Sequence, residues 1–250
     1  MAMMFANYLK LLLAFLSAFW ILWVKFPRLN KDQQLLEIQN WSRHTLAVLK
    51  VHLNLPHDQH SLFLANAPKL LVANHVSWVD ALVIQALQPS IFVAKAEVQR
   101  WPVVGAIAAG CGVIFVKRAS PSSARSMVDD VAQALHSGYH VACFPEGTSS
   151  EGLEVQPFHA NLFESAIQHH VPVQPLTLRY THPNTRQHCT KAAFVGELGF
   201  LESLHQVITA GGIEVTVVAG EAISPRGHSR KSLAQLAHIS VSTELAALSV

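Results

Sequence analysis

Short apolar runs alternate with helix-like segments along most of the chain, and this alternation predicts the fold. Strands are expected where apolar residues run together between turn residues, and helices where they recur every three or four positions. The predicted strands are 69–73, 91–94, 113–117, 140–144, 173–180, 192–196 and 213–219. The predicted helices are 78–87, 122–137, 158–169 and 233–247. Strands that alternate with helices indicate an α/β fold, with a mostly parallel central sheet flanked by helices.

The first 55 residues have a different pattern. Leu11–Val24 is apolar apart from Ser17. A helix of this length rises about 21 Å, less than the hydrocarbon core of about 30 Å, so the segment either barely spans a membrane or lies in one leaflet. A second helical pattern covers 32–53, and Pro27 separates the two. We therefore expect a membrane-docking helical hairpin over residues 1–55 and an α/β domain over residues 56–250.

A cleaved signal peptide and a buried core helix are the alternatives for the first helix. The apolar run ends at Val24 without the small residues that a cleavage site needs. Lys25, Arg28 and Lys31 lie just beyond it, and basic residues tend to stay on the cytoplasmic side of a membrane. The pattern therefore predicts that the body of the protein lies on the cytoplasmic face of the inner membrane.

Composition narrows the classes of function. Half of the residues are apolar and 14% are charged, against about a quarter in ordinary soluble domains. The net charge of +2 is too small to favour a nucleic acid partner. Cys111, Cys143 and Cys189 form no C-x-x-C pair and are expected to be free thiols in a reducing compartment. The fifteen histidines are scattered, so we expect no metal site.

Chemistry is expected where strands of such a sheet end, and the segment after 69–73 carries Asn74, His75 and Asp80. Histidine can accept a proton from a hydroxyl, and a carboxylate on its other ring nitrogen would fix its tautomer. Positions five apart lie about 140° apart on a helix, so the two side chains meet only if His75 precedes the first turn. Ser77 as the cap residue would allow that. Taken alone, the segment is also compatible with a strand-end histidine and a capping aspartate.

Two further predicted strands end in polar residues. In Phe144–Thr148, Glu146 can accept hydrogen bonds from a polyol, Gly147 permits close approach of the backbone, and Thr148 can donate to an anion. Arg118 can bind a phosphate through two N–H groups. Taken alone, the first segment is compatible with a simple turn, and the second with a solvated cation at a strand end.

Together, these segments resemble the glycerolipid acyltransferase family that includes bacterial 1-acyl-sn-glycerol-3-phosphate acyltransferase. Asn74-His75 with Asp80 resembles its first motif, N-H-x-x-x-x-D, and Phe144–Thr148 resembles its third, F-P-E-G-T. The second motif is similar to Lys95, Glu97, Pro102, Gly105, Gly112, Phe115 and Arg118. The fourth is similar to Val171, Pro172, Val173 and Pro175. The resemblance covers roughly residues 68 to 180.

The resemblance implies a reaction and a role for each residue. His75 would be the general base and Asp80 its partner. The head group of the acceptor would be bound by Arg118, Glu146, Gly147, Thr148 and Lys95. A fatty acyl group would pass from acyl-CoA or acyl carrier protein to the free hydroxyl of a lysolipid. The expected acceptor is 1-acyl-sn-glycerol-3-phosphate and the product phosphatidic acid. No cofactor is expected, and the partners would be the membrane lipid and the acyl donor.

Two departures from the family's pattern leave other acceptors open. The family often has arginine where Ser149 stands, and often Lys-x-Gly near Phe158–Asn161. Both changes remove positive charge or flexibility, and the pattern is also similar to the branch that acylates lyso-ornithine lipids. A membrane-bound esterase or thioesterase and a non-catalytic lipid-binding module are the alternatives from other classes. Thiol release without lysolipid would indicate the first alternative, and tolerance of His75→Ala the second.

Overall fold

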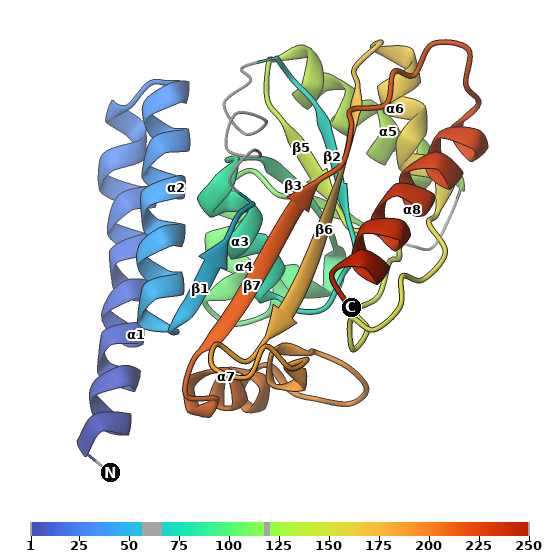
Figure 1. The fold of residues 1–250 in the computed structure, drawn as a ribbon. Coiled ribbons are helices and arrows are strands. Elements are labelled where there is room, and N and C mark those ends of the chain that lie inside the picture. Colours follow the sequence, from blue (N-terminus) through green and yellow to red (C-terminus); the bar gives the residue numbers. More distant parts are fainter. Residues whose placement is uncertain (1, 57–66, 118–120, 250) are drawn as a thin grey trace.

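The computed structural model describes residues 2–56, 67–117 and 121–249. Their strands form a seven-stranded sheet in the order β1-β7-β6-β2-β5-β3-β4, with helices on both faces (Figure 1). All neighbouring strands are parallel except β6 and β7. The strands are β1 Val51–Asn54, β2 Leu70–Ala73, β3 Ile91–Lys95, β4 Ile114–Val116, β5 Val141–Cys143, β6 Val173–Thr181 and β7 Ile213–Ala219. The predicted α/β fold with a mostly parallel sheet is confirmed.

The core lies on both faces of the sheet because the central strands are apolar on both sides. In β2, Leu71 packs into one cluster of buried side chains, whereas Leu70 and Val72 pack into the other. Successive side chains of a strand point to opposite faces, so a continuous apolar run fills two layers. The helices that follow the hairpin are α3 Val79–Leu87, α4 Val104–Gly110, α5 Pro121–His136, α6 Phe163–Gln168, α7 Phe200–Thr209 and α8 Arg230–Ala247.

The chain begins with a helical hairpin, as the sequence predicts. Helix α1 (Ala2–Trp20) continues through a π-helical and a 3-10 turn to Arg28, and α2 (Lys31–Val48) returns beside it (Figure 1). The side chain of Asn30 accepts a hydrogen bond from the backbone N–H of Gln33, which starts α2. The indole of Trp41 donates to the carbonyl of Ala14 and joins the two helices.

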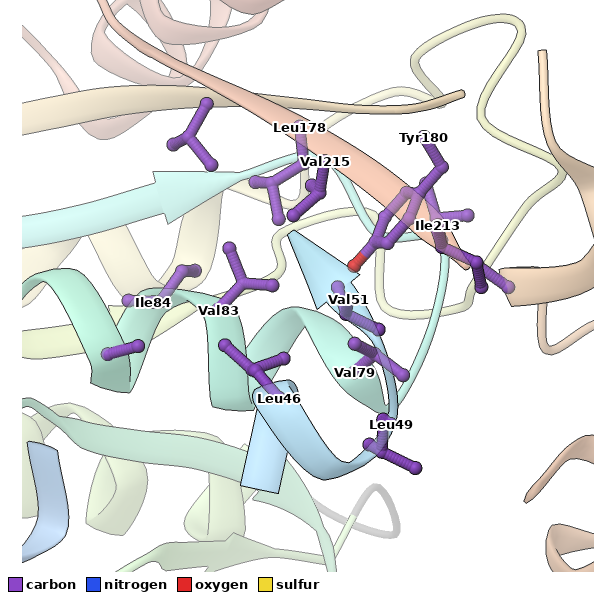
Figure 2. Close-up of a cluster of buried hydrophobic side chains, with 14 of the residues drawn as sticks. Leu46, Leu49, Val51, Val79, Val83, Ile84, Leu178, Tyr180, Ile213 and Val215 are labelled. Carbon is purple, nitrogen blue, oxygen red and sulfur yellow. The ribbon is translucent and has the colours of Figure 1, made fainter. Parts of the chain in front are cut away.

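Helix α2 connects the hairpin to the sheet through α3. Gln39 Nε2 and Arg43 Nε donate to the carbonyls of Leu87 and Ala86, the last residues of α3. The carbonyls at the end of a helix lack partners within that helix, so these donors fix the carboxyl end of α3. The end of α2 also contributes buried leucines to the core cluster that includes Val79 and Tyr180 (Figure 2).

Three predicted elements differ from the structure. The second helix was predicted to reach residue 53, but it ends at Val48, and Val51–Asn54 forms strand β1. Lys50 turns the chain with a φ of 56°, a conformation that glycine usually adopts, so a lysine at this position does not indicate a helix end. The predicted strand 192–196 is a loop after a 3-10 turn. The predicted helix 158–169 is a 3-10 turn over Ala160–Leu162 followed by α6.

The carboxyl end of β2 is held to β6 by a side chain. Asn74, which is buried, donates to the carbonyl of Leu178 at 2.9 Å and accepts from the N–H of Leu178 at 2.8 Å. This pair of bonds continues the ladder of β2 and β6 after its last backbone pair, Ala73 with Leu176. The residue that follows Asn74 therefore leaves the sheet at a fixed point.

Replacing Asn74 by alanine is expected to lower the free energy of unfolding by about 2–4 kcal/mol, because one buried N–H and one buried C=O of Leu178 lose their partner. Urea denaturation of the detergent-solubilised protein measures this change. The control is Asn184→Ala, at an exposed turn position, which should change the free energy of unfolding by less than about 0.5 kcal/mol. Equal stability of the two variants would contradict the role of the Asn74 side chain.

Candidate functional site

The first candidate pair, His75 and Asp80, meets at the end of β2. His75 Nδ1 lies 2.8 Å from Asp80 Oδ2. The helix that contains Asp80 begins only at Val79, so His75 precedes its first turn, as the five-residue spacing requires. The cap position is Trp78 rather than the predicted Ser77, although Ser77 Oγ accepts a hydrogen bond from the N–H of Val79 at 3.3 Å.

Asp80 is wholly buried and accepts four hydrogen bonds. Its Oδ2 atom accepts from His75 Nδ1, from the N–H of Val76 at 2.7 Å and from the N–H of Ser77 at 2.9 Å. Its Oδ1 atom accepts from the hydroxyl of Tyr180 at 2.6 Å. A buried carboxylate is costly unless donors surround it, and here both oxygens are bonded. Asp80 is therefore held in one orientation toward His75.

The imidazole of His75 is bonded to Asp80 through one nitrogen, and its side chain is partly exposed. An ionised carboxylate only accepts hydrogen bonds, so Asp80 fixes the proton of the ring on Nδ1 and leaves the Nε2 lone pair available. The ring stacks on Phe144, with centroids 4.1 Å apart and planes 9° apart. The His75 side chain is 23% exposed, whereas Asp80 is inaccessible. The ring can therefore take up a proton at Nε2 and exchange it with a bound molecule.

Glu146 also holds this segment, but through the backbone. Its Oε1 accepts from the N–H of His75 at 2.7 Å, and its Oε2 accepts from the N–H of Gln156 at 2.9 Å. Burial raises the pKa of Glu146 to about 6, and the two N–H donors oppose that rise. Both oxygens are engaged, so Glu146 fixes the position of His75 relative to the loop after β5.

The backbone around His75 has partners on both sides. The carbonyl of His75 accepts from the N–H of Ser150 at 2.9 Å, and the carbonyl of Val76 accepts from the N–H of Phe194 at 2.8 Å. Together with the N–H groups of residues 75–77, these bonds tie the segment to the loop after β5 and to the loop before α7. The site is therefore preorganised rather than formed by one flexible loop.

The remaining predicted site residues have different surroundings. Gly147 adopts a φ of 69° in the loop after β5, which favours glycine, and Thr148 follows it with an exposed side chain. Lys95 is exposed at the carboxyl end of β3, the same edge of the sheet. Arg118 lies outside the described residues. The structure thus brings His75, Asp80 and the loop of Glu146 together.

Several residues that contact the site are not indicated by the sequence, among them Tyr180 and Phe194. Tyr180 lies one hundred positions from Asp80 on β6, and Phe194 lies in a segment predicted to be a strand. Only the tertiary structure brings them to the site.

In the described parts of the chain, no three His, Cys, Asp or Glu side chains are grouped so that they could hold a metal ion.

Comparisons with known proteins point to one family. A family model described as Acyltransferase matches residues 49–179. Lyso-ornithine lipid O-acyltransferase of Pseudomonas aeruginosa is 36% identical over 174 residues, which are 70% of this chain and 66% of that protein. A protein of the same name from Rhizobium meliloti is 37% identical over 68% of this chain and 62% of its own length. The chain therefore spans just under two thirds of these relatives.

Two further similarities concern proteins named for another acceptor. The 1-acyl-sn-glycerol-3-phosphate acyltransferase of Neisseria gonorrhoeae is 40% identical over 111 residues, 44% of each chain. The crystal structure of the 1-acyl-sn-glycerophosphate (LPA) acyltransferase PlsC from Thermotoga maritima matches with a TM-score of 0.67. That match covers 98% of this chain and 96% of the other at 21% identity, so it shows the shared fold alone.

The raised pKa of Glu146 predicts a pH-dependent stability. A carboxyl whose pKa rises from 4.5 to about 6 on folding binds its proton more tightly in the folded protein. Its contribution to stability is therefore fully present below about pH 4.5 and is lost as pH rises through about 6. The loss corresponds to about 2 kcal/mol. The variant Glu146→Gln has no titrating group at this position. The free energy of unfolding of the variant minus that of the wild type should therefore increase by about 2 kcal/mol between about pH 4 and pH 7.5.

Denaturant unfolding of both proteins across this range measures the difference, in which contributions from other titrating groups cancel. A difference between wild type and Glu146→Gln that stays constant with pH would contradict the raised pKa.

Proposed function

Since this chain belongs to the Acyltransferase family, we propose that it transfers a fatty acyl group from a thioester donor to the free hydroxyl of a lysolipid. The observation that carries this proposal is the bond from His75 Nδ1 to the buried Asp80, on a histidine whose side chain is partly exposed. A neutral imidazole in this tautomer is a general base for a hydroxyl. No enzyme nucleophile is needed for a direct transfer.

The proposed transfer has two proton steps at His75. Nε2 accepts the proton of the lysolipid hydroxyl while its oxygen attacks the carbonyl carbon of the thioester. The negative charge of Asp80 stabilises the imidazolium that forms. The carbon–sulfur bond then breaks, and the leaving thiolate takes the proton from Nε2. The products are the diacylated lipid and a free thiol, and the histidine returns to its starting state.

The proposed donor is acyl-CoA or acyl carrier protein, and the first proposed acceptor is 1-acyl-sn-glycerol-3-phosphate. Head-group binding is proposed for Arg118, Lys95, Gly147 and Thr148. Glu146 is proposed to act on the same loop through the backbone bonds that it accepts. In the sequence these residues end or follow β3, β4 and β5, so the acceptor would lie across the carboxyl edge of the sheet, next to His75.

A second acceptor, lyso-ornithine lipid, is favoured by a particular contact. Ser149 stands where the family often has arginine, and its hydroxyl donates to the carbonyl of Phe194. That position therefore supplies a hydrogen bond within the protein instead of a cation for a phosphate. The Pseudomonas aeruginosa and Rhizobium meliloti relatives, which align over about two thirds of this chain, are named for lyso-ornithine lipid.

We also propose that the hairpin docks the enzyme on the cytoplasmic face of the inner membrane. Of the described residues, one helical stretch, Ala6–Arg28, is long and apolar enough to cross a membrane. One side of this stretch packs on the protein, and a large apolar surface remains open to solvent. Such a surface is typical of a lipid or protein contact. Its exposed side chains are Leu9, Leu12, Leu13, Leu16, Trp20, Trp23 and Val24.

Replacing His75 by alanine should reduce lysolipid-dependent release of free thiol from acyl-CoA by at least about a hundredfold, because the general base is lost. A thiol-reactive dye measures the release in mixed micelles. His52→Ala, at an exposed position of β1, is the matched control and should retain activity. Unchanged turnover of His75→Ala would rule out the general-base proposal. Thiol release by the wild type without lysolipid would instead identify a thioesterase.

The acceptor is tested by comparing wild type with Ser149→Arg and Ser149→Ala. If the missing cation limits use of a phosphate head group, Ser149→Arg should raise the ratio of kcat/KM for 1-acyl-sn-glycerol-3-phosphate over lyso-ornithine lipid by about tenfold. Ser149→Ala loses the bond to Phe194 without adding charge and should leave this ratio unchanged. The same measurements, repeated with acyl-CoA and with acyl carrier protein as the thioester, identify the donor. Equal ratios in all three proteins would show that position 149 does not select the acceptor.

A further inference from the structure

The hydroxyl of Tyr180 lies in the core directly behind Asp80. The tyrosine is 1% exposed, and its ring lies among aliphatic side chains of α2, α3, β6 and β7 (Figure 2). Its hydroxyl donates to Asp80 Oδ1 at 2.6 Å, and Asp80 Oδ2 holds His75. The three side chains therefore form one hydrogen-bonded chain that runs from the apolar core to the partly exposed imidazole.

We propose that Tyr180 is a positioning residue of the active site, which sets the orientation and the effective charge of Asp80 and thereby the basicity of His75. This proposal rests on the acyl transfer proposed above. The match to the family model ends at residue 179, one position before Tyr180. Tyr180 does not touch a substrate in this arrangement, because it is buried behind the carboxylate.

The direction of the Tyr180 bond follows from the electrostatics of the core. Burial, together with the charge of Asp80, raises the pKa of the Tyr180 hydroxyl well above its ordinary value. The phenol therefore stays protonated and is a donor throughout the working range. Donation to Oδ1 draws negative charge away from the carboxylate, so Asp80 stabilises a protonated His75 less than an unbonded carboxylate would.

A packing role alone does not require this hydroxyl. An apolar phenylalanine ring would fill the same space among the aliphatic side chains, but it would leave Asp80 Oδ1 buried without a donor. Besides the bond between His75 and Asp80 themselves, two ionisable side chains are hydrogen-bonded to these residues in the described part of the chain, Tyr180 to the Asp80 carboxylate and Glu146 to the backbone of His75. Glu146 bonds to the backbone N–H of His75, so Tyr180 is the neighbour that acts on the carboxylate itself.

The variant Tyr180→Phe tests the proposal through the pH profile. With the donor gone, His75 should become more basic, and the acid limb of kcat/KM should move upward by roughly half a pH unit. Because Asp80 is also less firmly oriented, kcat should fall about tenfold or more with little change in KM. Tyr139→Phe is the matched control, because Tyr139 precedes the amino end of β5, whereas the site lies at the carboxyl ends of the strands. A lower kcat with an unshifted acid limb would reduce Tyr180 to a structural role and overturn the proposal.

A second protein keeps the test decisive if Tyr180→Phe folds poorly. In the double variant Tyr8→Phe/Tyr139→Phe, Tyr180 is the remaining tyrosine of the chain. Its replacement by 3-fluorotyrosine retains the shape and makes the phenol a stronger donor. The acid limb should then move downward relative to the unfluorinated double variant, opposite in sign to Tyr180→Phe. An acid limb at the same pH in both would overturn the proposal.

A third measurement separates this proposal from the acyl-transfer proposal. The pH at which the His75 ring is half protonated can be followed by NMR, with His75→Gln used to identify its signal. A shift of this midpoint in the predicted directions supports Tyr180 as a positioning residue even if no lysolipid is acylated. Absence of acylation would contradict only the proposed reaction. Normal acyl transfer with an unmoved midpoint would overturn only the role of Tyr180.

Discussion

The arrangement of the site depends on one buried carboxylate. Asp80 accepts hydrogen bonds from an imidazole, from two consecutive backbone N–H groups and from a phenol, which come from the β2–α3 connection and from β6. An ion in the core is tolerated only when such donors replace its water. The donors stabilise the Asp80 carboxylate, and the hydrogen bonds that they form with it also fix the donors in place. The position of His75 is thus a consequence of satisfying this charge.

The order of the strands explains why motifs far apart in the sequence meet. Strand β2 lies between β6 and β5, so its carboxyl end is flanked by Tyr180 on one side and by the loop of Glu146 on the other. Asn74 fixes the exit of the chain on the β6 side, and Glu146 takes the N–H of His75 on the β5 side. The carboxylates of Asp80 and Glu146 and the amide of Asn74 therefore hold one short segment. The head group of the proposed acceptor would be bound by other residues.

The sequence predicted the parts that depend on local patterns. Apolar runs gave the positions of β2, β5 and β7, and the five-residue spacing showed that His75 had to precede its helix. The sequence could not show the helix end at Lys50, where a lysine adopts a conformation typical of glycine. It also could not show the bond from Tyr180, which depends on the pairing of distant strands. Glu146 was expected to bind a polyol, but its partners are two backbone N–H groups.

Helix α3 links the hairpin to the candidate site. Its first turn carries Asp80, and its last carbonyls accept hydrogen bonds from Gln39 and Arg43 of α2. Because α3 is nine residues long, these two ends are only about 13 Å apart. Docking of the hairpin on a lipid surface, as proposed, would therefore also set the direction in which His75 faces that surface. A lysolipid hydroxyl that remains near the head-group region would then reach a base that is already oriented toward it.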